Sequence, residues 1–387
     1  MELSPSPTTS PTYQRAPGYL QRLGLADWLF ALLLCVGAGV ALARYSSFMD
    51  IYEKVILLAS VPTFVALGWH FKAVRWLMPL VALLSLWAVS LYDGNLDAAQ
   101  TKFFLKYMLS SQSAILWMST LFAFSTVFYL VGLLSRSNFG NSVGSKLCWA
   151  AVVLGWTGMM VRWFESYLIG PDVGHIPVSN LYEVFILFAM ITAMFYLYYE
   201  ERYATRQLGA FVMLVIAAAV AFLLWYTVSR DAAGIQPLVP ALQSWWMKIH
   251  VPANFIGYGT FALAAMVATA YLLKTSGYLA DRLPALEVLD DVMYKAISVG
   301  FAFFTVATIL GALWAADAWG TYWQWDPKET WALIVWLNYA AWLHMRLISG
   351  LRGRVAAWWA VGGLLVTTFA FLGVNMFLSG LHSYGKL

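Results

Sequence analysis

The sequence predicts an all-α, polytopic integral membrane protein with about eleven transmembrane helices. Of its 387 residues, 61% are hydrophobic and only 11% are charged, and apolar runs of about 20 residues recur from end to end. A soluble protein carries about 25% charged residues. This chain has too few to coat a soluble domain of its size, which excludes soluble enzymes, disordered proteins, disulfide scaffolds and nucleic-acid-binding modules.

Eleven apolar runs are each long enough to cross a bilayer as a helix, which takes about 20 residues. Residues 1–18 form a polar tail rich in Ser, Pro and Thr, and the first run after it is expected to act as an uncleaved anchor. The predicted spans fall near residues 25–43, 54–70, 75–92, 114–134, 147–166, 180–199, 208–228, 252–273, 294–316, 329–348 and 355–378.

A polar stretch at residues 93–112 separates the first three spans from the other eight. We therefore expect an N-terminal part, residues 1–110, made of the polar tail and about three extra transmembrane helices. The rest of the chain, residues 111–387, is expected to form a core of about eight transmembrane helices. A tryptophan-rich loop at 314–331 then lies on the extracytoplasmic side of this core.

The positions of Lys and Arg indicate how the spans are oriented. With the N-terminus in the cytoplasm, cytoplasmic segments carry 14 of these 23 residues and the opposite side carries 8, while Arg162 lies within a span. Cytoplasmic loops are normally the more basic ones, so we expect the C-terminus and the tryptophan-rich loop outside. The tail lacks plastid-like features, which favours the bacterial inner membrane, with a periplasmic loop, over the thylakoid membrane.

One histidine lies at membrane depth. His344 is in the tenth predicted span, 15 residues after Glu329, which is about 22 Å along a helix. An ionisable side chain at this depth suggests a functional site, and a hydrogen bond to a neighbouring helix is the alternative. Position alone does not decide between the two.

Two further histidines lie at the outer ends of spans. His250 precedes the eighth span in "LQSWWMKIHVP", and His382 follows the last span in "SGLHSYGKL". Taken singly, each is explained by an ordinary interfacial position. His70 is expected at the cytoplasmic interface, and His175 in a loop rich in Gly and Pro.

The loop "WGTYWQWDPKETW", residues 319–331, is unusually rich in tryptophan. Asp326 predicts a helix N-cap, with Pro327 in the first helical position and Glu329 completing a capping box. Neither this cap nor the usual interfacial role of tryptophan explains so many indoles in one place. A cluster of flat aromatic rings suits a flat apolar ligand such as a porphyrin, with histidines on either side of its iron. The residues are Trp314, Trp319, Trp323, Trp325 and Trp331.

A second capping motif is "PVSNLYE", residues 177–183, in which Asn180 and Glu183 predict a capping box at the start of the sixth span. This structural role is sufficient for the motif, and we assign no chemistry to it on these grounds.

Five strings, in this order, resemble one known family. They are "GHIPVSNLYE", "PALQSWWMKIHVP", the tryptophan-rich loop, "LHMR" and "VNMFLSGLHSYG". The loop is similar to the WWD signature of haem-handling membrane proteins, and the whole set resembles the CcsA subunit of the system II cytochrome c synthase. The resemblance covers about residues 112–387.

This resemblance implies a function in cytochrome c biogenesis. The family acts with a partner, CcsB, as a haem exporter and a holocytochrome c synthase of the haem lyase type. Haem b crosses the membrane, and its vinyl groups are joined by thioether bonds to the CxxCH motif of apocytochrome c on the outer face. We expect CcsB, apocytochrome c and thioredoxin-like thiol reductants as partners.

The resemblance also implies roles for individual residues. By analogy, His250 and His382 ligate the iron of an outer haem, and His344 contributes to an inner haem site whose second ligand comes from CcsB. The tryptophan-rich loop would form a platform that presents the vinyl edge to the incoming thiols. Its residues assigned to the chemistry are Trp319, Trp323, Trp325 and Asp326, with Trp314 and Trp331 as further haem contacts.

Arg162 is a candidate for pairing with a haem propionate, because guanidinium groups bind carboxylates well. The alternative is an ion pair inside the protein with Glu165 or Glu183.

Two alternative functions are compatible with some of these features. A system I protein that transfers or loads haem shares the tryptophan-rich loop, but "GLHSYG" and "PVSNLYE" favour CcsA. An ion-coupled transporter would need acidic residues in mid-span, whereas here Asp and Glu cluster at span ends and in loops.

Overall fold

The computed structural model describes residues 18–381, and this part of the chain is built of helices without any strand. Short 3-10 turns connect several helices, and π-helical segments occupy Leu105–Leu109 and Phe369–Gly373. The helices are α1 (Leu25–Tyr45), α2 (Ile51–His70), α3 (Val74–Tyr92), α4 (Ala98–Thr101), α5 (Ser111–Leu134), α6 (Asn138–Ile169), α7 (Leu181–Tyr203), α8 (Gly209–Arg230), α9 (Met247–Thr275), α10 (Leu286–Trp319), α11 (Pro327–Ile348), α12 (Gly353–Thr368) and α13 (Val374–Phe377).

The predicted all-α membrane architecture is confirmed, and each of the eleven predicted spans corresponds to a helix. Within the described residues, ten helical segments are long and apolar enough to cross a membrane. The one that falls short is α11, although its 22 residues would extend about 33 Å. Its hydropathy is lowered by polar side chains such as Asn338, His344 and Arg346.

The chain divides into two compact units, residues 1–78 and 79–387, and the division falls inside α3. In the described part of the first unit, Asp27 is buried in the first turn of α1 and pairs with Arg75, with 2.9 Å between Oδ1 and Nη1. His70 stacks on Tyr19 at a ring distance of 5.4 Å. The division into residues 1–110 and 111–387 remains a prediction.

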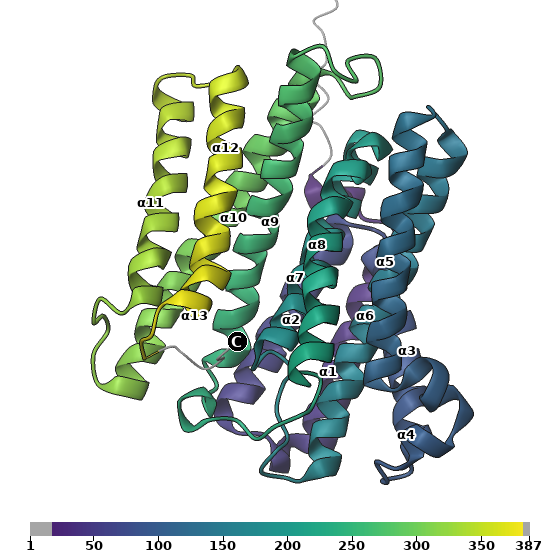
Figure 1. Cartoon of the computed structure of the whole chain (residues 1–387). Coiled ribbons are helices and arrows are strands. Elements are labelled where there is room, and N and C mark those ends of the chain that lie inside the picture. Colours follow the sequence, from purple (N-terminus) through teal and green to yellow (C-terminus); the bar gives the residue numbers. More distant parts are fainter. Residues whose placement is uncertain (1–17, 382–387) are drawn as a thin grey trace, which may run out of the picture. The chain divides into compact units, whose positions relative to one another are not determined.

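The second unit is a helical bundle centred on α7 and α9. Most residues in the apolar windows of these two helices are buried, 83% in α7 and 78% in α9. Helices α5, α6 and α8 pack on the α7 side, and α10, α11 and α12 pack on the α9 side. The loops after α8 and α10 lie at one end of this bundle, and the turns from α9 to α10 and from α11 to α12 lie at the other (Figure 1).

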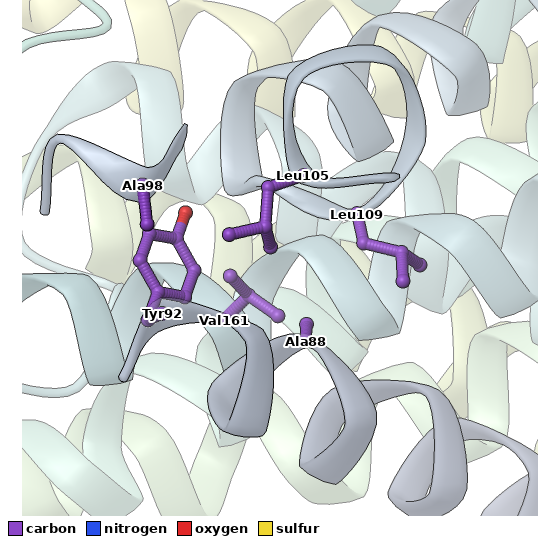
Figure 2. Close-up of a cluster of buried hydrophobic side chains, with 6 residues drawn as sticks. All are labelled: Ala88, Tyr92, Ala98, Leu105, Leu109 and Val161. Carbon is purple, nitrogen blue, oxygen red and sulfur yellow. The ribbon is translucent and has the colours of Figure 1, made fainter. Parts of the chain in front are cut away.

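The polar stretch after α3 is fixed to this bundle by a buried cluster. Ala98, Leu105 and Leu109 from the stretch pack with Tyr92 of α3 and Val161 of α6, as Figure 2 shows.

The same region is anchored by a buried carboxylate of α6. The hydroxyl of Tyr92 and the backbone N–H and hydroxyl of Ser111 donate to Glu165. Glu165 is therefore engaged in positioning the start of α5.

Candidate functional site

A cavity of about 240 Å³ lies at the end of the bundle where α9 and α11 begin and α10 ends. It collects residues from three of the motifs singled out in the sequence: the start of α9, the tryptophan-rich loop and the segment 178–181. Its walls also include parts of the π-helical segment and α13. The chemistry-bearing residues that line it are His250, Trp314, Trp319, Trp323, Lys328 and Glu329.

His250 is held in a defined orientation in the first turn of α9. Its Nδ1 lies 2.8 Å from the carbonyl oxygen of Ala307 on α10. A carbonyl can only accept, so Nδ1 carries the proton and Nε2 is the basic nitrogen of the neutral ring. Metal-binding histidines are commonly oriented in this way by a backbone carbonyl.

The position of this ring depends on a glycine. A Cβ added at Gly311 of α10 would lie 2.8 Å from Cε1 of His250 and 3.2 Å from its Nδ1. The missing side chain of Gly311 thus makes room for the imidazole. The edge of Trp314, one turn further along α10, meets the same ring at a centroid distance of 5.6 Å.

Three tryptophans line the cavity. Trp314 is fixed by its indole N–H, which donates to the carbonyl oxygen of Ala241 at 3.1 Å. Trp319 ends α10, and Trp323 lies half-buried in the loop that follows. Together they contribute large apolar side chains to the lining of the cavity.

The other two tryptophans of the loop lie elsewhere. Trp325 is 68% exposed, has a left-handed backbone with φ of 57°, and is absent from the cavity lining. Trp331 packs on Phe369 with 4.3 Å between ring centroids. The indoles of this region therefore lie in three places: in the cavity lining, at the surface (Trp325), and between α11 and the π-helical segment (Trp331).

Asp326 is the N-cap of α11, and the predicted capping box is confirmed. Its Oδ1 accepts from the backbone N–H of Lys328 at 2.9 Å, while Glu329 Oε2 accepts from the N–H of Asp326 at 3.2 Å and of Gln324 at 2.8 Å. The caps therefore fix both the start of α11 and the loop before it.

The same carboxylate holds the C-terminal segment. Asp326 Oδ2 accepts from the backbone N–H of Leu381 at 2.6 Å. A Cβ at Gly380 would meet this oxygen at 2.2 Å, so only glycine permits the approach. His382, the next residue, lies outside the described residues, but the chain that leads to it is tied to the tryptophan-rich loop.

Lys328 and Glu329 are charged residues of the cavity, although the sequence predicts only a helix-capping role for Glu329 and no role for Lys328. Lys328 is half-buried, and desolvation lowers the pKa of its ammonium to about 8, although the Asp326 carboxylate acts in the opposite direction. Glu329 is 91% buried, and its Oε1 has no hydrogen-bond partner. No sequence pattern marks these side chains as cavity walls, because this depends on how α9, α10 and α11 pack.

Arg162 lies outside the cavity lining and is almost fully buried. Its Nε donates to Glu183 Oε1 at 2.7 Å and its Nη1 to the carbonyl oxygen of Ala233 at 2.7 Å. Its guanidinium also lies 5.0 Å from the ring centre of Tyr182. Of the two partners considered for Arg162 inside the protein, the structure shows Glu183.

The motif at residues 177–183 differs from the prediction in one respect. Asn180 caps α7 by accepting from the N–H of Glu183 at 3.0 Å, as predicted. The Glu183 carboxylate does not complete the capping box, because it accepts instead from Arg162 and from both the N–H and the hydroxyl of Ser179.

His344 and His175 are not among the residues that line the cavity. His344 is exposed on α11, toward the end of the bundle opposite the tryptophan-rich loop. His175 is buried in its loop, with Nδ1 2.7 Å from the carbonyl oxygen of Val173 and Nε2 3.1 Å from Ser179 Oγ. Both ring nitrogens of His175 are thus used within the loop.

Comparison with known proteins identifies relatives of this chain. The family model described as cytochrome C assembly protein matches residues 178–382. A cytochrome c biogenesis protein CcsA of Chlorella vulgaris is 34% identical over 304 residues, which cover 68% of this chain and 92% of the relative. A CcsA protein of Parasynechococcus marenigrum is 36% identical over 255 residues, covering 59% and 81% respectively.

A solved structure, described as the cytochrome c haem lyase CcmF, has a similar fold. Its TM-score is 0.54 at 16% sequence identity, and the match covers 68% of this chain and 48% of that one. At this identity the similarity concerns the fold alone.

Proposed function

This chain belongs to the cytochrome c assembly protein family, with CcsA proteins as its relatives, and on that premise we propose that its cavity binds haem as the substrate of cytochrome c maturation. The observation that carries the proposal is the cavity itself, which His250 lines together with Trp314, Trp319 and Trp323. An apolar slot with an oriented imidazole is what a metalloporphyrin requires.

Two histidines would hold the iron in this site. His250 has its Nδ1 proton directed to Ala307, which makes Nε2 the nitrogen able to donate to iron. His382 is the second candidate, and the bond from Leu381 to Asp326 supports it by bringing the chain to the same loop. Bis-imidazole ligation would keep the iron six-coordinate until the histidine of the CxxCH motif replaces one ligand.

The reaction proposed for this site is the addition of a cysteine thiol of apocytochrome c to each vinyl group of haem b. A carbon–sulfur bond forms at the inner vinyl carbon, and the thiol proton ends on the terminal carbon, so no oxidant or reductant is consumed. The role of this chain is to position the haem and to exclude water from it. Thioredoxin-like reductants would keep the two thiols of the substrate reduced.

The inner haem site is assigned to His344 together with a residue of CcsB. The exposed position of His344 on α11 supports this, since an imidazole at the surface of the lone chain can share an iron with another subunit. His344 and Glu329 are separated by about 22 Å along α11, so the proposed inner and outer sites lie toward opposite ends of this helix.

The orientation of the chain in the membrane rests on its basic residues. We place the cavity, the tryptophan-rich loop and the C-terminus on the periplasmic side of a bacterial inner membrane, as the distribution of Lys and Arg indicates. A system I haem-transfer role has less support, because the relatives are CcsA proteins.

Maturation of a reporter cytochrome c, in a strain without its own synthesis system but supplied with a CcsB partner, tests the proposal. His250→Ala should abolish maturation, and added imidazole should partly restore it by filling the vacated axial position. Trp323→Ala should also abolish maturation while the protein still accumulates. Trp325→Ala is the matched control, because this indole is exposed outside the cavity, and it should have the smaller effect. Normal maturation with both His250→Ala and Trp323→Ala would refute the site.

A further inference from the structure

The cavity contains a cation that makes no hydrogen bond or ion pair within the described structure. Lys328 is the one Lys or Arg among the residues that line it. No hydrogen bond or ion pair of the Lys328 ammonium occurs among residues 18–381. A half-buried ammonium without a counter-ion is costly, which indicates that the cavity is suited to an anionic group.

Neither of the two neighbouring carboxylates makes a hydrogen bond or an ion pair with the Lys328 ammonium in the described residues, although Asp326 is close enough to stabilise its charge. Asp326 uses its oxygens for the backbone N–H groups of Lys328 and Leu381. Glu329 directs Oε2 to two backbone N–H groups of the loop, and its Oε1 is buried without a donor. As an acceptor, this oxygen needs a donor group, which a carboxylate ligand does not supply, so the proposal depends on Lys328 alone.

Arg162, the basic residue expected to pair with a propionate, does not line the cavity. Arg162 is bound to Glu183 and to the carbonyl oxygen of Ala233, away from the cavity. Any carboxylate that enters the cavity therefore meets Lys328 as its cationic partner.

We propose that Lys328 binds a carboxylate of the planar substrate, which is a propionate group if the substrate is haem. This inference rests on the proposed function. In a haem ring the propionates and the vinyl groups lie on opposite parts of the rim, so an ion pair at the start of α11 fixes how the ring is turned in its own plane. Lys328 is thus a positioning residue: it sets which edge of the ring is presented to the thiols, while His250 sets the height of the iron.

The test compares two probes, ferric haem and its dimethyl ester, in which both propionates are blocked. Each is titrated into purified protein and followed by its Soret band, for wild type, Lys328→Met and Lys328→Arg. Lys102→Met is the matched control, because it also removes one positive charge, from an exposed residue outside the cavity.

Wild type and Lys102→Met should bind haem about 10-fold or more tightly than the ester, as expected for a hydrogen bond to a charged group. In Lys328→Met this preference should disappear, and Lys328→Arg should keep most of it. The ester is more apolar and partitions more strongly into detergent. Because the ratio of haem affinity to ester affinity is compared between variants in the same detergent, this difference cancels.

Three outcomes overturn the proposal, and they are distinguishable. If wild type binds haem and ester equally well but His250→Ala binds neither, the haem site stands and the role of Lys328 is wrong. If Lys328→Met, folded as judged by its thermal transition, keeps the full preference, the role is also wrong. If wild type binds neither probe, the proposed function itself fails.

Discussion

Replacing Gly311 by alanine should damage the site without removing any functional group. The new Cβ would lie 2.8 Å from Cε1 of His250, whereas carbon atoms pack at about 3.5–4.0 Å. The imidazole or α10 must therefore shift by about 0.7 Å or more. A shift of this size breaks the bond from Nδ1 to the carbonyl oxygen of Ala307 and overpacks the contact between α9 and α10, at a cost of about 1–3 kcal/mol.

Activity should fall further than stability, because a catalytic geometry displaced by about 1 Å can lose about 100-fold in rate. We expect Gly311→Ala to reduce reporter cytochrome c maturation about 10- to 100-fold while the protein still accumulates. Gly362→Ala on α12 is the control. It makes the same change in a helix, but no atom lies within 4 Å of its new Cβ, and its maturation should equal that of wild type.

A double substitution separates this mechanism from general damage. In the His250→Ala background the space next to Gly311 is open, so the thermal transition should no longer be lowered by Gly311→Ala. If Gly311→Ala matures the reporter normally, or destabilises both backgrounds equally, the argument from the imidazole position is wrong.

Three further sets of variants separate roles that the structure assigns. Asp326→Asn can still cap α11 but offers an N–H₂ group where Leu381 needs an acceptor, so maturation should fall while thermal stability stays unchanged. Asp326→Ala should also lose about 1 kcal/mol of stability. Equal maturation in wild type and both variants would contradict the proposed role of Asp326 in holding Leu381. Removing Glu183 alone should leave the Arg162 charge buried without its partner, which lowers the stability of the fold by about 3–5 kcal/mol and reduces protein abundance. Replacing both Arg162 and Glu183 by methionine should restore abundance and maturation. Loss of haem in this double variant would instead show that Arg162 binds the ligand. His344→Ala, purified with the partner, should lack haem at both sites until imidazole is added, and a full outer haem without imidazole would refute the relay.

Helix positions were predictable where a local signal exists. Asp326 and Asn180 mark the starts of α11 and α7 because their side chains cap the first turn, and the structure has both caps. Apolar runs located all eleven long helices but not their full lengths. The predicted span 147–166 is the middle of α6, which extends over Asn138–Ile169. The added residues 138–146 at its start are mostly glycine and polar residues, which no hydropathy signal marks.

The cavity was predictable only in part. Motif strings selected His250 and the tryptophan-rich loop, but not which indoles point inward. The sequence does not distinguish Trp323 from Trp325. In the structure, Trp323 lines the cavity, whereas Trp325 has a left-handed backbone and does not. Lys328 and Gly311 gave no signal at all, because the importance of each comes from neighbours on other helices.

The central claim is that the cavity beside His250 binds haem through this imidazole. It is tested most directly by titrating ferric haem into purified His344→Ala protein, in which the inner site is disabled, and recording the visible spectrum. We predict the spectrum of a six-coordinate, low-spin haem, which is lost when His250→Ala is added and restored by imidazole. Identical spectra with and without His250 would contradict the account.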